Sequence, residues 1–235
     1  MTHYVLVAGA WLGSWAWDEV VPELRAAGHE VTALTLSGLA EKREVRAGLE
    51  THVQDVVEAV VSRDLREVVL VGHSYAGIPV GQAAERIGDR LSRVVFVDSN
   101  IPEDGESFLS SWPEGRPFIE ASMAENDGNW APLGPERFEG QELDEQQVAR
   151  ILARSTPHPG ATLVDPAKLS RPVGELPATY LQCLLSTEEL MPTVAAEVAA
   201  GRWRLATLET GHWPMFSRPT ELAGLLLAEA ATAGD

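Results

Sequence analysis

The chain has 235 residues, of which 45% are hydrophobic, and it carries a formal net charge of −17. This length allows one large hydrophobic core, and no Ser/Gly-rich linker divides the sequence, so we expect a single domain. The strong negative charge argues against nucleic acid and anionic membranes as partners. No apolar stretch approaches the roughly 20 residues of a membrane span.

The composition also indicates a compartment. The first residues run directly into a β-type segment, without the basic and apolar regions of a secretory signal. Cys183 is the single cysteine, which excludes an internal disulfide and fits a reducing cytoplasm. The 16 Arg against 2 Lys suggest a GC-rich bacterial genome. We therefore expect a cytoplasmic bacterial protein. Its oligomeric state stays open, with a homodimer as one option.

Short β-type runs alternate with helical patterns along the chain. In order, we expect strand 4–7, helix 17–27, strand 30–34, helix 49–62, strand 67–71, helix 76–88, strand 93–98, strand 178–183, helix 190–199, strand 202–208 and helix 219–231. Most of these strands are nearly continuous in Val, Leu and Ile, as strands buried on both faces are. The alternation predicts an α/β fold with a doubly wound, mostly parallel six-stranded sheet. Ligands bind such sheets at the carboxyl ends of the strands.

Residues 101–168 interrupt the alternation. The segment is rich in Pro, Gly and acidic residues, and it contains several aromatic residues. Because a structureless loop of this length is improbable, we expect a small, mostly helical cap inserted within the single domain. Its most regular helix is expected at 144–153, with Asp144 as the N-cap.

The most informative motif is GHSYA at residues 72–76, followed by Gly77. It lies between a predicted strand and a predicted helix, which is the setting of a nucleophile elbow, and Ser74 is the expected nucleophile. Ala76 replaces the last glycine of the G-x-S-x-G pattern. Alanine is small enough for the helix and strand still to approach each other closely.

A serine hydroxyl becomes a good nucleophile only when a base removes its proton. The run TGHWP at residues 210–214 follows the last predicted strand. It places His212 in a glycine-flanked loop at the carboxyl end of the sheet, so His212 is the expected base.

The first strand ends in the small-residue run VLVAGAWLG at residues 5–13. Small residues let this backbone pass close to the elbow, where the N–H groups of Ala10 and Tyr75 would form an oxyanion hole. The G-x-G-x-x-G pattern of dinucleotide sites is absent. No His, Cys and carboxylate cluster has metal-ligand spacing, so we expect neither cofactor nor metal.

On these residues the chain resembles the α/β-hydrolases. Within them it is similar to the compact group of plant methyl-ester esterases and hydroxynitrile lyases and their bacterial relatives. The resemblance covers nearly the whole chain and rests on segments 5–17, 27–34, 71–77, 95–98, 102–105, 211–215 and 218–219. It implies the α/β-hydrolase fold, with Ser74 as nucleophile, His212 as base, and the amides of Ala10 and Tyr75 as oxyanion donors.

Two departures from that group stand out. Its members usually carry His-Gly where this chain has Ala8 and Gly9. Its catalytic acid normally follows the strand before the last, in a run Cys-Thr-x-Asp. Counted forward from Cys183, the place of that aspartate is held by Ser186; counted back from the following proline, it is held by Glu188.

The acid of the triad therefore stays open. An orienting carboxylate fixes the imidazole tautomer and stabilises the imidazolium, so its loss is costly. Glu188 is one candidate, and Asp98, at the end of the preceding strand, is the other. A site without any acid is the third option.

These residues predict a cofactor-independent serine hydrolase that cleaves an ester or lactone of a small, largely apolar molecule through an acyl-enzyme. The expected pocket walls are Trp11, Trp112, Trp130, Trp213 and Met215. The departures at Ala8 and Ser186 leave open a non-hydrolytic C–C lyase or cyclase that uses His212 as acid and base. A ligand-binding protein with slow turnover is a further alternative.

Overall fold

The structure is a computed structural model that describes residues 1–186 and 189–231. Six parallel strands form the central sheet in the order β2-β1-β3-β4-β7-β8. Their bounds are β1 (His3–Val7), β2 (Glu30–Leu34), β3 (Val68–His73), β4 (Leu91–Val97), β7 (Ala178–Cys183) and β8 (Trp203–Leu208). The predicted six-stranded parallel sheet is confirmed. The strand predicted at 93–98 ends at Val97 in the structure. Asp98 therefore lies just beyond β4, in the loop at the carboxyl end of the sheet.

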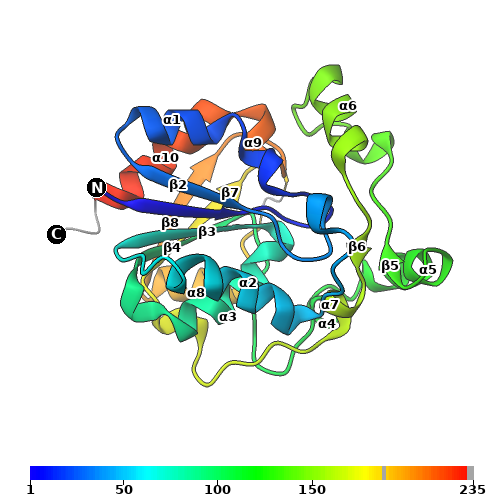
Figure 1. The fold of residues 1–235 in the computed structure, drawn as a ribbon, viewed down its shortest axis with the longest axis horizontal. Coiled ribbons are helices and arrows are strands. Elements are labelled where there is room, and N and C mark those ends of the chain that lie inside the picture. The colour runs from blue at the N-terminus through cyan, green and yellow to red at the C-terminus, as the bar shows by residue number, and fades with distance from the viewer. Residues whose placement is uncertain (187–188, 232–235) are drawn as a thin grey trace.

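Helices cover both faces of this sheet (Figure 1). One face carries α1 (Val20–Ala26), α9 (Pro214–Ser217) and α10 (Pro219–Ala231), and α1 packs against α10. The other face carries α2 (Leu49–Val61), α3 (Gly77–Arg86) and α8 (Pro192–Ala199), and α2 packs against α3. Short 3-10 turns lie at η1 (Ser14–Trp17), η2 (Ala40–Lys42), η3 (Ser74–Ala76), η4 (Gly88–Arg90) and η6 (Val173–Glu175).

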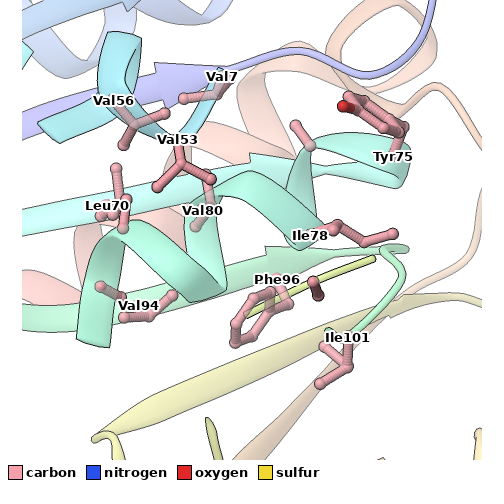
Figure 2. Packing of buried hydrophobic residues seen from close by; sticks show 14 of the residues in the cluster. Val7, Val53, Val56, Leu70, Tyr75, Ile78, Val80, Val94, Phe96 and Ile101 are labelled. Carbon is pink, nitrogen blue, oxygen red and sulfur yellow. The ribbon is translucent and has the colours of Figure 1, made fainter. Parts of the chain in front are cut away.

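Two hydrophobic clusters hold these layers together, one on each face of the sheet. Val5 and Val7 of β1 join the cluster that includes α2 and α3, whereas Tyr4 and Leu6 join the cluster that includes α1 and α10. Figure 2 shows part of the first cluster, in which Val53 of α2 packs close to strand β3. Burial of one such side chain contributes about 1.5–3 kcal/mol, so the strands form a rigid base for the loops at their carboxyl ends.

The segment 101–168 contains seven short elements. They are α4 (Phe108–Ser111), α5 (Arg116–Glu125), β5 (Asn129–Trp130), η5 (Pro135–Phe138), α6 (Glu145–Arg154), β6 (His158–Pro159) and α7 (Ala161–Val164). In Figure 1, α5, α6 and the β5–β6 pair lie to one side of the sheet. The segment is tied to the loop after β1, because Trp11 Nε1 donates to the Trp130 carbonyl at 3.2 Å and Thr156 N–H donates to the Trp11 carbonyl at 3.0 Å.

The predicted helix at 144–153 is confirmed as α6. The Asp144 carboxylate accepts a hydrogen bond from the N–H of Gln147 at 2.8 Å, which makes it the N-cap. The antiparallel pair β5–β6 was not predicted, since strands of two residues have no periodic signal. Across the described part of the chain, no helix has the length and apolar character needed to span a bilayer.

Candidate active site

The turn after β3 places Ser74 at the carboxyl end of the sheet. Ser74 is the first residue of η3, and its φ of 54° lies in the left-handed region that non-glycine residues seldom adopt. The loop after β1 passes so close that a Cβ on Gly9 would lie 2.7 Å from the Ser74 Cβ. Ala76 is fully buried in the core, so the turn accommodates its methyl group. The local chain therefore forms the strand, turn and helix that the motif predicted.

His212 lies in the loop between β8 and α9. Its Nε2 is 2.8 Å from Ser74 Oγ, and its side chain is 27% exposed. Nδ1 lies beside a carboxylate and therefore carries the ring proton, which leaves the Nε2 lone pair facing the serine hydroxyl. The structure thus brings together the predicted nucleophile and the predicted base.

Asp98 supplies the carboxylate next to His212. Its Oδ2 is 2.5 Å from His212 Nδ1, and its Oδ1 accepts the N–H of Cys183 at 3.4 Å. Burial of this side chain opposes ionisation, but hydrogen bonds from His212 and Ser186 outweigh it and hold the pKa of Asp98 below its usual value. Glu188, the other candidate acid, lies outside the described residues.

Ser186 has a particular relation to this acid. It occupies the position at which the forward count from Cys183 expects an aspartate, and its hydroxyl is hydrogen-bonded to Asp98. The carboxylate comes from the residue just after β4, and Ser186, in the loop after β7, forms a hydrogen bond with it.

His73 bridges three parts of the site. Its Nδ1 accepts the N–H of Gly9 at 3.3 Å, and its Nε2 donates to the carbonyl of His212 at 2.7 Å. Burial, together with the neighbouring His212, lowers the pKa of His73 to about 3, so the ring is neutral and can fill both roles. Through these two hydrogen bonds, His73 holds the loop after β1 and the loop that carries His212 close to the nucleophile turn.

The two predicted oxyanion donors face the same space as Ser74. Ala10 and Tyr75 both line the pocket that contains the serine and the histidine. Within the described residues the N–H of Ala10 has no acceptor. The N–H of Tyr75 is in the first turn of η3, where amides have no intrahelical acceptor. Both amides are therefore free to bind a developing negative charge.

Backbone strain gathers around this pocket. Trp11, Ser74 and Asp98 have φ values of 65°, 54° and 43°, and all three line it. Left-handed conformations of non-glycine residues cost about 1–3 kcal/mol and persist where the surrounding structure enforces them, often at functional sites.

The pocket has a volume of about 660 Å³, and its wall combines aromatic side chains with polar and charged ones. Four of the predicted wall residues line it: Trp11, Trp112, Trp130 and Trp213. Met215 does not line it. The α9 helix turns this side chain into the core cluster shared with α1 and α10, where it is fully buried. Phe108, Tyr180 and Met191 add apolar surface that the sequence analysis did not single out.

A buried polar cluster supports the nucleophile turn from behind. The Tyr75 hydroxyl lies 2.9 Å from His52 Nδ1, and its ring makes an edge contact with the ring of His158 at 4.4 Å between centroids. The other ring nitrogen of His52 donates to the carbonyl of Ser37 at 2.7 Å. Burial lowers the pKa of His52 to about 4 and the pKa of His158 well below its usual value, so both rings are neutral. Figure 2 shows Tyr75 at the turn that follows β3.

With this geometry established, comparison with known proteins decides the family. The model of the alpha/beta hydrolase family matches residues 4–225. The chain belongs to the alpha/beta hydrolase family. The resemblance drawn from the motifs is therefore confirmed.

This alpha/beta hydrolase is similar to named esterases over almost its full length. It is 29% identical to the carbendazim hydrolyzing esterase of Nocardioides sp. (strain SG-4G), which aligns over 97% of this chain and 99% of the relative. It is 31% identical to methylesterase 9 of Arabidopsis thaliana, with 97% of each chain covered. Among solved structures, an extracellular alpha/beta-hydrolase from a Paenibacillus species superposes with a TM-score of 0.86 at 24% identity, covering 98% of this chain and 99% of that one.

Two residues of the alpha/beta hydrolase site were missed by sequence reasoning. His73 was not singled out as a site residue, although its place directly before the nucleophile was a usable signal. Gln141 lines the pocket and binds the backbone of His212, and nothing in its local sequence marks it. In residues 1–186 and 189–231, no three His, Cys, Asp or Glu side chains lie close enough to hold a metal ion.

Proposed function

We propose that this alpha/beta hydrolase is a serine esterase that cleaves an ester or lactone of a small, largely apolar molecule through an acyl-enzyme. The observation that carries the proposal is the continuous hydrogen-bonded series from Asp98 through His212 to Ser74, at the wall of the aromatic pocket. The names of the similar proteins, a carbendazim hydrolyzing esterase and methylesterase 9, support ester cleavage.

In the first half of the reaction, Ser74 Oγ attacks the substrate carbonyl carbon while its proton moves to His212 Nε2. The negative charge on the carbonyl oxygen is bound by the N–H groups of Ala10 and Tyr75. Removal of one such donor in other enzymes costs about 100- to 1,000-fold in kcat. The leaving alcohol takes the proton from His212, and the acyl group stays on Ser74.

In the second half, His212 Nε2 removes a proton from water, which attacks the acyl-enzyme. The same two amides bind the second oxyanion, and Ser74 leaves with the proton from His212. Asp98 stays ionised throughout and stabilises the imidazolium in both steps. Its lowered pKa favours this role.

The substrate class follows from the walls of the pocket. Trp11, Trp112, Trp130 and Phe108 offer apolar surface, beside polar groups that include the reacting Ser74 and His212. Such a wall favours an apolar acyl or alcohol group, because burial of apolar surface drives binding.

The lyase and cyclase alternatives rested on the departures at Ala8 and Ser186, which left the triad without an assigned acid. The hydrogen bond from His212 to Asp98 supplies one, and the named esterases among the relatives favour hydrolysis. We therefore retain one proposed function. The remaining expectations, a cap over the site and a cytoplasmic location, belong to the same proposal.

The test compares p-nitrophenyl acetate hydrolysis and fluorophosphonate labelling in the wild-type protein and in Ser74→Ala. The wild type is expected to turn over the ester and to be labelled at Ser74, and Ser74→Ala is expected to lose both. Ser92→Ala, which removes a hydroxyl from β4 outside the pocket, serves as the matched control and keeps both activities. Full turnover by Ser74→Ala would disprove the covalent mechanism.

A further inference from the structure

Gln141 lies in the segment 101–168, just after η5, and reaches the loop that carries His212. Its Oε1 accepts the N–H of His212 at 2.7 Å. A backbone N–H is a donor only, so the side-chain amide must present its oxygen here. The contact is therefore defined by chemistry as well as by distance.

The carbonyl on the other side of His212 is bound too. It accepts from His73 Nε2 at 2.7 Å. The N–H and the carbonyl of His212 are thus both hydrogen-bonded, the first to Gln141 of the segment 101–168 and the second to His73, the residue before the nucleophile. With Asp98 on Nδ1, these contacts leave the ring little freedom to move away from Ser74.

The backbone also packs closely at this point. A Cβ added to Gly211 would lie 2.6 Å from the Cα of Gln141, and it would also collide with the Gln141 side-chain oxygen. The loop before His212 therefore lies directly against the backbone of Gln141. A change in the position of this part of the segment would be transmitted to the His212 peptide.

We propose that Gln141 is a positioning residue for the base, which links the seating of the segment 101–168 over the pocket to the reactivity of Ser74. This inference rests on the proposed function, because it concerns the base of that reaction. The proposal requires that the hydrogen bond accepted by Gln141 Oε1, and not the size of the side chain, holds His212 in place. A misplacement of about 1 Å in a catalytic group can cost about 100-fold in rate.

Three variants separate the effect of this hydrogen bond from the effects of side-chain size and of general docking of the segment 101–168. Gln141→Met keeps the size of the side chain and removes the acceptor, and Gln141→Glu keeps an acceptor. Gln147→Met is the matched control. Gln147 also joins this segment to the C-terminal part of the chain, because its Nε2 donates to the carbonyl of Phe216 in α9 at 2.7 Å, but it forms no hydrogen bond with His212. Each variant is assayed for kcat and KM on p-nitrophenyl acetate, for the rate of Ser74 phosphonylation by a fluorophosphonate, and for its melting temperature.

We expect Gln141→Met to lower kcat and the phosphonylation rate by about 10- to 100-fold with little change in KM. Gln141→Glu should restore most of this rate, and the acid limb of its kcat/KM profile should move to higher pH because the carboxylate stabilises the imidazolium. Gln147→Met should stay close to the wild type in rate.

The proposal is overturned if Gln141→Met keeps the wild-type rates, or if Gln147→Met is equally impaired, since the effect would then be one of general docking. It is also overturned if Gln141→Glu is no better than Gln141→Met. Failure of the proposed function would give a different result from failure of the proposed role of Gln141. A wild type that is labelled at Ser74 but cleaves no ester contradicts the function, and the phosphonylation rates still decide the role of Gln141. A wild type without labelling contradicts both.

Discussion

The carboxylate of Asp98 lies 2.5 Å from Nδ1 of His212, although the two residues are 114 positions apart in the chain. Parallel pairing of β4 and β7 makes this possible, because Val97 is in register with Leu181 and the N–H of Cys183 then reaches the Asp98 carboxylate. The carboxylate keeps the proton of the imidazole on Nδ1, so that Nε2 can accept the proton of Ser74.

The first prediction concerns that carboxylate. Asp98→Asn should lower kcat by about 10,000-fold, because an amide neither stabilises the imidazolium nor enforces the reactive tautomer. The measurement is kcat on p-nitrophenyl acetate, with circular dichroism to verify the fold. Asp104→Asn, which changes an exposed carboxylate that accepts the N–H of Leu169, is the control and should retain activity. A near-normal kcat in Asp98→Asn would mean that Asp98 is not the acid.

A second prediction follows from the bond between Ser186 and Asp98. Asp98→Ala should be nearly inactive, and adding Ser186→Asp should recover about 10-fold or more of the lost kcat, since a carboxylate at 186 can enter the space that Asp98 leaves. Ser186→Asp alone should be harmful, because two neighbouring carboxylates raise each other's pKa. A double variant no more active than Asp98→Ala would show that position 186 cannot supply the acid.

These relations explain what was predictable from the sequence. Ser74 and His212 were predictable because each follows a strand that can be recognised from its own residues. A β-type run precedes GHSYA, and another precedes TGHWP. The choice between Asp98 and Glu188 was not local. It depends on which strands pair, and on the register of β4 against β7, which no single-sequence periodicity reveals.

The same limit applies to the pocket. The four tryptophans were assigned as wall residues because large aromatic side chains often line apolar sites, and the structure places them there. Met215, also apolar and adjacent to the base loop, follows Pro214 into α9 and points into the core instead. Gln141 reaches His212 across 71 positions, which no local pattern anticipates.

A third prediction concerns His73. His73→Phe keeps an aromatic ring but removes the acceptor for Gly9 N–H and the donor for the His212 carbonyl. Each buried group left unpaired costs about 1–3 kcal/mol, so the loss of both partners should lower the free energy of unfolding by about 2–6 kcal/mol. kcat should fall as well, because the oxyanion loop and the base lose their common support. Urea unfolding and ester hydrolysis measure the two effects, and an unchanged kcat would limit His73 to a role in stability.

A fourth prediction concerns stability at acid pH. The pKa of His73 is lowered to about 3 and that of His52 to about 4, and the pKa of His158 is also lowered, in each case mainly by burial. The unfolded chain binds protons at these residues near pH 6.5, whereas the folded chain does not, so stability is complete above that pH and is lost as the pH falls. His73 and His52 should each cost about 1.5 kcal/mol between pH 6.5 and 5, because the loss approaches about 1.4 kcal/mol per unit only below the unfolded pKa, and His158 acts in the same direction.

His158→Gln separates this effect from the titration of carboxylates. The variant should lose less stability than the wild type over the same pH interval, since one of the three buried histidines is gone. Parallel curves for His158→Gln and the wild type would show that His158 does not titrate differently in the folded and unfolded states.

The central claim is that Ser74 forms an acyl-enzyme, and intact-protein mass spectrometry during turnover tests it most directly. When p-nitrophenyl acetate is mixed with the wild type and quenched within the first turnovers, we expect one acetyl group per chain. Peptide mapping should place this group on Ser74, and it should be absent from Ser74→Ala. An adduct on a residue other than Ser74, or undiminished hydrolysis by Ser74→Ala, would contradict the account.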